Sequence, residues 1–131
     1  MAKIILIDDD PQVRSVLAGF LKIGNHQVVE AENGQQGLYL LSLEQPDLII
    51  TDIVMPQTDG FELIMALAKQ EKPQRIIAIS GGSRSMQKEM LIGMAQSMPV
   101  NKVLEKPVSC EILLAAVEEA LISPPPRTLN E

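Results

Sequence analysis

The chain has 131 residues, a formal net charge of −6 and a hydrophobic content of 46%. This length and apolar content are typical of one compact domain with a buried core, and they exclude a chain that is disordered throughout. The acidic balance and an aromatic content of 2% argue against a sequence-independent nucleic-acid binder, which needs clustered cations or stacking platforms.

The sequence indicates a cytoplasmic protein. A single cysteine, Cys110, cannot form an internal disulfide bond and is compatible with a reducing compartment. The apolar run Ile4–Ile7 is too short for a signal peptide and is followed at once by three aspartates. No apolar stretch approaches the roughly 20 residues that a membrane-spanning helix needs.

Five short apolar runs, most of them rich in Ile and Val, predict strands that are buried on both faces of a sheet. These runs are Lys3–Ile7, Gln27–Ala31, Leu48–Thr51, Arg75–Ile79 and Lys102–Leu104.

Amphipathic segments of helical period separate the runs. Asp10 and Pro11 begin the first segment as an N-cap followed by proline at the first helical position. The other helices are expected to begin near Asn33, after Gly60, near Ser85 and after Ser109. The residues expected to face the core are Val13, Val16, Leu17, Phe20 and Leu21 in the first helix, Phe61, Ile64, Met65 and Ala68 in the third, and Ile112, Leu113, Ala116, Val117 and Ala120 in the fifth.

Strand–helix alternation repeated five times predicts an α/β fold of the (βα)5 type, a doubly wound five-stranded parallel sheet with helices on both faces. The flavodoxin-like strand order 2-1-3-4-5 is expected. Residues 1–122 form the predicted domain. Residues 123–131 contain three consecutive prolines, which cannot continue a helix, and are either a disordered end or the start of a linker.

Polar residues follow the strands at their carboxyl ends. Asp8–Asp10 follow the first strand, Asp52 the third and Ser80 the fourth, and Lys106 lies just past the fifth. In an open parallel sheet, ligands bind outside the carboxyl ends at the point where the strand order reverses, here between the first and third strands. We therefore expect these side chains to converge.

Carboxylates that share a pocket repel one another, and a hard divalent cation such as Mg²⁺ relieves the repulsion, with Mn²⁺ as an alternative. Phosphoryl transfer to a carboxylate such as Asp52 needs such a cation, an ammonium such as Lys106 and a hydroxyl donor such as Ser80. Taken singly, Asp10 is a helix cap, Lys106 a surface lysine and Ser80 a loop residue. Their combination at four strand ends favours a phosphoryl-transfer site.

Four segments carry a resemblance to the receiver domain of two-component response regulators, of the chemotaxis-regulator kind, over about residues 2–122. They are IILIDDDPQVR from Ile4, PDLIITDIVMPQTDGFELI at 46–64, IIAISGG at 76–82 and LEKPVS at 104–109.

The resemblance implies that Asp52 is the phosphoacceptor, modified to 4-aspartylphosphate. It implies that Asp9 ligates Mg²⁺ directly, that Asp8 ligates it through water or supports the site, and that Asp52 and the carbonyl of Val54 complete the protein ligands. Ser80 would hydrogen-bond the phosphoryl group and move with it.

Two neighbouring residues complete the implied machinery. Lys106 would pair with a phosphoryl oxygen, and Pro107 matches the family's cis proline, which aims the lysine. Such a protein is not an enzyme in the usual sense, although it assists its own phosphorylation and dephosphorylation.

The implied phosphodonor is a phosphohistidine on a sensor histidine kinase or a histidine phosphotransfer protein. Partner choice is expected to lie in exposed residues of the first helix, with Gln12, Ser15 and Val16 as candidates. Phosphorylation would alter an output face that controls a downstream partner or a fused effector domain, and homodimerisation on phosphorylation is compatible with it. No direct contact of this chain with nucleic acid or membrane is expected.

The sequence departs from the family pattern at several positions. Val103 replaces an aromatic residue that moves inward in many receivers, so the signal is expected to travel by the Ser80 loop and the fourth helix. Val54 and Gly82 flank the phosphoryl position without a polar group to orient water, which predicts slow self-dephosphorylation. The stretch from Ser80 to Lys106 is a few residues longer than usual.

The predicted fourth helix carries methionines at a spacing of four residues, for which core packing and a binding surface are both open explanations. They are Met86, Met90, Met94 and Met98.

Two other functions compete with a phosphorylated receiver. A pseudo-receiver that binds proteins without phosphorylation usually lacks the acceptor, an acidic partner or the lysine, and all three are present here. An aspartyl-nucleophile hydrolase would carry a second aspartate two residues after Asp52, where this chain has Val54.

Overall fold

The computed structural model describes residues 1–53, 60–70, 72–80 and 99–126. The expectations for the carbonyl of Val54, for Gly82 and for the fourth helix with its four methionines lie outside these residues, as does the side chain of Phe61. None of the helices in the described part is long and apolar enough to cross a membrane.

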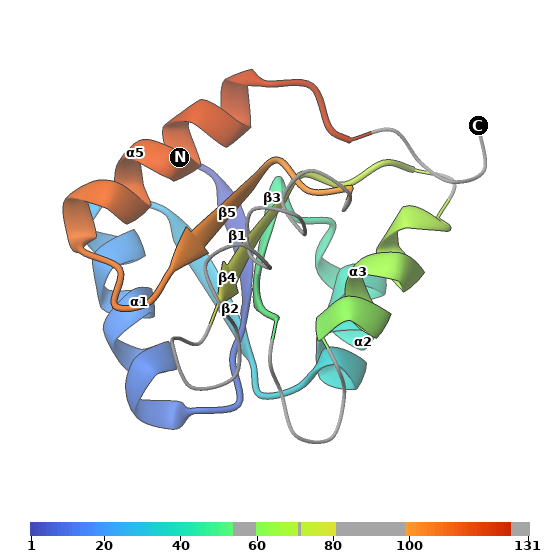
Figure 1. Cartoon of the computed structure of the whole chain (residues 1–131), viewed down its shortest axis with the longest axis horizontal. Coiled ribbons are helices and arrows are strands. Elements are labelled where there is room, and N and C mark those ends of the chain that lie inside the picture. The colour runs from blue at the N-terminus through green and yellow to red at the C-terminus, as the bar shows by residue number, and fades with distance from the viewer. Residues whose placement is uncertain (54–59, 71, 81–98, 127–131) are drawn as a thin grey trace.

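The described residues form one five-stranded parallel sheet with strand order β2-β1-β3-β4-β5 (Figure 1). This result confirms the predicted fold class and topology. The strands are β1 (Lys3–Ile7), β2 (Gln27–Ala31), β3 (Leu48–Asp52), β4 (Ile76–Ser80) and β5 (Lys102–Glu105). Strand β3 extends one residue beyond the prediction and β4 is shifted by one residue toward the carboxyl end, so that Asp52 and Ser80 are the last residues of their strands.

Three of the helices in the described part begin after the capping residues that the sequence predicts. Asp10 caps α1 (Pro11–Ile23) by accepting from the backbone N–H of Gln12 at 2.9 Å, and Ser109 caps α5 (Cys110–Ile122). The other two helices in the described part are α2 (Gly34–Glu44), which Asn33 caps, and α3 (Gly60–Ala68).

Helices cover both faces of the sheet, with α1 and α5 on one face and α2 and α3 on the other (Figure 1). Side chains alternate between the faces along each strand. Ile4 and Leu6 therefore pack with α1 and α5, whereas Ile5 and Ile7 belong to the core cluster on the α3 face. The two cores bury Ile4–Ile7 of β1 and so fix the position of its carboxyl end.

Three residues expected to face the core are exposed instead. Val16, Met65 and Ile112 expose 54%, 40% and 55% of their surfaces. Ala18 and Leu67 are buried on the same helices as Val16 and Met65. An apolar residue at the margin of the apolar stripe of a helix fits the helical period, but its side chain can still lie outside the surface that contacts the sheet.

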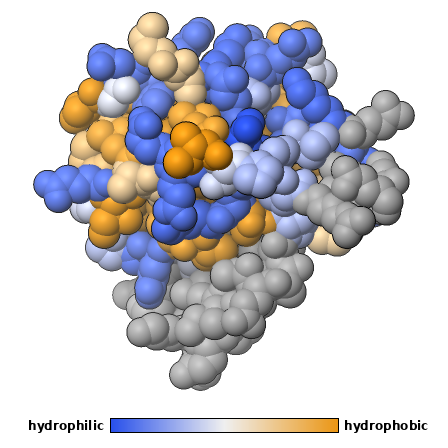
Figure 2. Space-filling view, turned by 90° about the horizontal axis from the view of Figure 1, so that it is seen from above, coloured by the Kyte–Doolittle hydropathy of each residue, from blue (hydrophilic) through white to orange (hydrophobic). Residues whose placement is uncertain are grey.

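Residues 123–126 cross the amino ends of β4 and β5, at the end of the molecule opposite the aspartates (Figure 1). Arg75 Nε donates to the carbonyl of Ser123 at 2.9 Å, and Asn101 Nδ2 donates to the carbonyl of Pro124 at 3.0 Å. Figure 2 shows this end from above, where apolar residues are interspersed with hydrophilic ones. The first part of the proline-rich segment is thus hydrogen-bonded to the domain.

Candidate functional site

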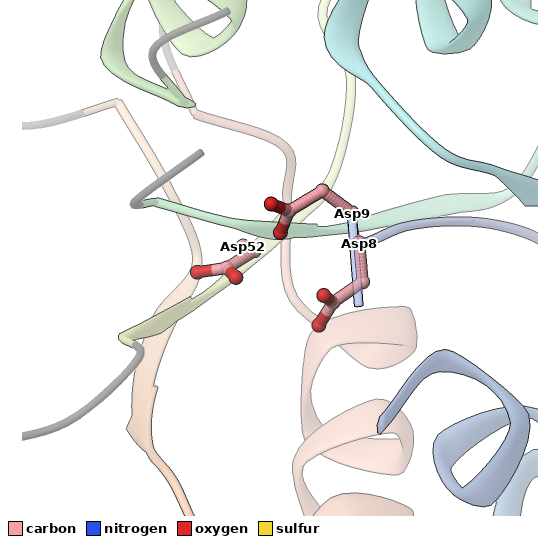
Figure 3. A group of neighbouring side chains, drawn as sticks. All are labelled: Asp8, Asp9 and Asp52. Carbon is pink, nitrogen blue, oxygen red and sulfur yellow. The ribbon is translucent and has the colours of Figure 1, made fainter. Parts of the chain in front are cut away.

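Three carboxylates lie together at the carboxyl edge of the sheet (Figure 3). Asp8 and Asp9 follow β1 directly, and Asp52 ends β3, which pairs with β1. Each of the three offers an oxygen atom, and these atoms all lie within 4.8 Å of one another. The parallel pairing of β1 and β3 therefore brings together aspartates that are far apart in the sequence.

Burial distinguishes the three carboxylates. Asp8 and Asp52 are 1% and 4% exposed, whereas Asp9 is exposed to solvent. Buried carboxylates need a nearby positive charge or hydrogen-bond donors, because burial otherwise disfavours the ionised form. Asp9 therefore lies on the solvent-exposed side of the cluster.

Lys106 supplies positive charge to both buried carboxylates. Its Nζ donates to Asp8 Oδ2 at 2.9 Å and to Asp52 Oδ2 at 3.1 Å. Partial burial by itself lowers the pKa of Lys106, but the hydrogen bonds and charges of Asp8 and Asp52 outweigh it and raise the pKa above its ordinary value of 10.5. Lys106 is therefore fully charged at neutral pH.

The backbone and side chain of Asp8 are held on every side. Its N–H donates to the carbonyl of Ala31 at 3.1 Å, and its Oδ1 accepts from the N–H of Asp10 at 2.9 Å. Its carbonyl accepts from Arg14 Nη1 at 2.7 Å. Arg14 Nε in turn donates to Glu30 Oε1 at 3.2 Å.

Arg14 contacts the loop Asp8–Asp10, but the sequence did not predict it as a residue of the site. A sequence displays charged side chains but not the backbone carbonyl that a guanidinium group binds. The available signal was an arginine one turn after the helix cap, together with an acid near the end of the neighbouring strand.

Ser80 is fully buried, and its Oγ makes no hydrogen bond within the described part of the chain. Its carbonyl accepts from the N–H of Lys106 at 3.0 Å, so the hydroxyl and the lysine belong to adjacent strand ends. The Lys106–Pro107 peptide bond is cis. Val103 is half-buried and packs against the core cluster on the α3 face.

The chemistry of the donors fits a hard divalent cation. Oxygen ligands from carboxylates are those that Mg²⁺ and Mn²⁺ prefer. Among the described residues, the three carboxylates outnumber the one ammonium group that contacts them, that of Lys106. A divalent cation beside Asp9 would balance this excess.

An apolar groove of about 480 Å³ adjoins the cluster. It lies between α1 and the segment that follows β5, and Val13, Val16 and Leu17 line it opposite Lys106 and Val108. The exposed side chain of Val16 forms part of the wall of this groove. A macromolecule that binds here would therefore reach the neighbourhood of Lys106.

Comparison with known proteins assigns the family. Residues 4–118 match the response regulator receiver domain, and the chain belongs to this family. Protein PilH of Pseudomonas aeruginosa is 34% identical over 121 residues, which cover 92% of this chain and 98% of PilH. The probable C4-dicarboxylate response regulator DctR of Bacillus subtilis is 34% identical over 119 residues, 89% of this chain but 51% of DctR.

Solved structures share the architecture. Chemotaxis protein CheY4 of Vibrio cholerae superimposes with a TM-score of 0.79 at 25% identity, covering 92% of this chain and 98% of CheY4. The receiver domain of NtrX from Brucella abortus gives a TM-score of 0.82 at 24% identity, over 92% and 99% of the two chains. At this identity the NtrX similarity concerns the fold alone.

Proposed function

We propose that this chain is a phosphorylation-activated signalling receiver in which Asp52 accepts a phosphoryl group from a phosphohistidine. The observation that carries the proposal is the double contact of Lys106 with Asp8 and Asp52, next to Asp9 and the buried hydroxyl of Ser80. In this proposal Asp52 is the acceptor, Lys106 the countercharge, Asp8 and Asp9 are cation ligands, and Ser80 is the hydroxyl donor.

In the proposed transfer, a carboxylate oxygen of Asp52 forms a bond to phosphorus while the P–N bond of the phosphoimidazole breaks. The imidazole leaves with the electron pair of that bond. Lys106 Nζ exchanges its contact with Asp52 for a phosphoryl oxygen, which places positive charge where negative charge develops. The hydroxyl of Ser80 gains a hydrogen-bond acceptor in the phosphoryl group.

Asp8, Asp9 and Asp52, with the carbonyl of Val54, would hold the divalent cation, Mg²⁺ or Mn²⁺. When bound, the cation neutralises phosphate charge and so lowers the barrier to attack by a carboxylate. The protein contributes rigidity, because Asp8 is fixed by four hydrogen bonds before any ligand arrives.

The partner that donates the phosphoryl group is a sensor histidine kinase or a histidine phosphotransfer protein. The groove between α1 and Val108 would receive an apolar surface of that partner and direct its histidine toward Asp52. Gln12 and Val16 line this groove and would contribute to partner choice.

The phosphorylated state would be read through Ser80 and the segment that follows it, because Val103 lacks the bulk of an aromatic ring. The output is control of a partner protein or of a fused effector domain, and a homodimer formed on phosphorylation is one route to it. We assign the receiver to residues 1–122, a role as a proline-rich tail or the start of a linker to residues 123–131, and a cytoplasmic location to the whole.

Val54 and Gly82 match the positions that flank the phosphoryl group in the family, and they would make the phosphorylated form long-lived, since neither has a polar side chain to orient an attacking water. The decay of phosphorylated protein in Mg²⁺ buffer, followed by intact mass, measures this lifetime. Loss of the phosphate within seconds would contradict slow self-dephosphorylation.

Incubation with a small acyl phosphate and Mg²⁺, followed by measurement of the intact mass, tests the proposal. We expect one added phosphate on the native chain, none on Asp52→Asn, and a strongly reduced yield when EDTA removes the cation. A native chain that remains unmodified would favour the pseudo-receiver, whereas catalytic turnover of an unrelated phosphoester would favour the hydrolase.

A further inference from the structure

A pair of charged side chains outside the carboxylate cluster supports the loop that carries it. Arg14, on α1, donates from Nη1 to the carbonyl of Asp8 at 2.7 Å and from Nε to Glu30 Oε1 at 3.2 Å. The Arg14 side chain is 17% exposed, and that of Glu30, on β2, is 40% exposed. The guanidinium group thus links helix α1, strand β2 and the loop Asp8–Asp10, which joins β1 to α1.

The carbonyl that Arg14 binds belongs to the peptide unit that joins Asp8 to Asp9. A peptide unit is planar, so holding its oxygen fixes the orientation of the whole plane and the direction in which the chain enters Asp9. The carboxylate of Asp9 is exposed, and its direction therefore depends on the backbone that carries it. Arg14 acts on Asp9 through this backbone.

We propose that Arg14 is a positioning residue for the divalent-cation site, with Glu30 as its anchor on β2. The inference rests on the proposed function, because it takes Asp8 and Asp9 as cation ligands. Groups that orient the ligands of a metal, without touching it, typically change metal affinity or activity by 10- to 100-fold when removed. Arg14 would aim Asp9 toward the point where the carboxylates of Asp8 and Asp52 also meet.

Both contacts of Arg14 suit a guanidinium group. Its planar fork offers several N–H donors in fixed directions, so one side chain can hold the Asp8 carbonyl and the Glu30 carboxylate together. A lysine ammonium offers the same charge without this fixed fork. Glu30 also neutralises the arginine, which reduces its repulsion of a cation bound nearby.

Positioning and simple electrostatics predict opposite effects for Arg14→Ala. Removal of a positive charge near a divalent cation should strengthen cation binding if only Coulomb forces act. Loss of the restraint on the Asp8–Asp9 peptide should weaken it. The sign of the change in affinity therefore distinguishes the two roles, independently of any phosphorylation.

The test is Mn²⁺ binding, measured from the electron paramagnetic resonance signal of the free ion at fixed ionic strength. We expect Arg14→Ala to bind Mn²⁺ about 10-fold more weakly than the native chain. Arg14→Lys, which keeps the charge, should also bind more weakly, though less so. Arg75→Ala is the matched control, because Arg75 likewise donates to a backbone carbonyl but does so at the opposite end of the sheet.

Equal or tighter binding by Arg14→Ala, or native affinity in Arg14→Lys, would overturn the positioning role and leave the proposed function standing. Absence of Mn²⁺ binding by the native chain would overturn both. Thermal unfolding without metal shows whether each variant is folded. If Arg14→Ala is not, Arg14→Lys decides, since an electrostatic role alone predicts no change for it.

Discussion

Replacement of Lys106 by methionine removes the ammonium group that bridges two buried carboxylates and keeps a side chain of similar length. Asp8 and Asp52 are 1% and 4% exposed, and Lys106 Nζ lies 2.9 and 3.1 Å from their oxygens. Loss of one partner of a buried ion pair costs about 3–5 kcal/mol, because a charge is left buried without compensation. The Lys106 side chain is itself 18% exposed, so water can enter the space and the lower end of this range applies.

We therefore expect Lys106→Met to lower the free energy of unfolding by about 3 kcal/mol in metal-free buffer. Urea unfolding followed by circular dichroism in EDTA measures this change. Saturating Mg²⁺ should stabilise the variant more than the native chain, because the cation then supplies the missing positive charge.

Lys102→Met is the control, since it removes an ion pair with Glu119 whose side chains are 39% and 64% exposed. Such a surface pair contributes about 0–1 kcal/mol. A Lys106→Met variant that is no less stable than Lys102→Met would refute the reasoning. Equal stabilisation of variant and native chain by Mg²⁺ would also contradict it.

Two further predictions follow from the geometry. The raised pKa of Lys106 means that its contribution to stability is complete below the ordinary value of 10.5 and is lost as the pH rises through the higher value of the folded state. The difference in unfolding free energy between the native chain and Lys106→Met should thus stay constant from about pH 7 to 9 and shrink above about pH 10.5. A difference that already shrinks near neutral pH would contradict this prediction. Gly37→Ala should destabilise the fold by about 1 kcal/mol, because the added Cβ would clash with Ile7 Cδ1. Gly19→Ala should instead stabilise the fold by up to about 1 kcal/mol, because no atom lies within 4 Å of the Cβ that would be added there and alanine favours a helix. Chemical denaturation of both glycine variants measures the contrast, and changes of the same sign would contradict it.

Much of the fold could be predicted because local and global signals agree. Each strand is a short apolar run, and each N-cap given for the described helices is a residue that favours capping. The strand order then placed Asp8 and Asp52 on neighbouring strands, so the cluster followed from topology without any structural data.

The depth of burial of single helical residues was harder to predict. Val16 and Ile112 satisfy the helical period but are more than half exposed, because the width of the buried stripe depends on how the helix lies against the sheet. In α1 the exposed Val16 lines the groove beside Lys106, so its position at the margin of the stripe bears on the proposed partner surface.

Contacts from side-chain donors to backbone carbonyls could not be predicted. Arg14 binds the carbonyl of Asp8, and Arg75 and Asn101 bind carbonyls of Ser123 and Pro124. The acceptors in these contacts are present in every residue, and only the folded chain shows which of them lies within reach. The contact of Arg14 with the Asp8 carbonyl is therefore visible in the structure alone.

The most direct test of the proposed function is to locate the phosphate in the chain. Borohydride reduces an aspartyl phosphate to homoserine, and trypsin then releases residues 23–69, a peptide that contains both Asp47 and Asp52. Asp47 is an internal control, since its carboxylate accepts from the N–H of Lys3 at the amino end of the sheet. We expect homoserine at position 52 and unchanged aspartate at position 47. Reduction at position 47, or at neither position in a chain that carries phosphate, would contradict the assignment of Asp52 as the acceptor.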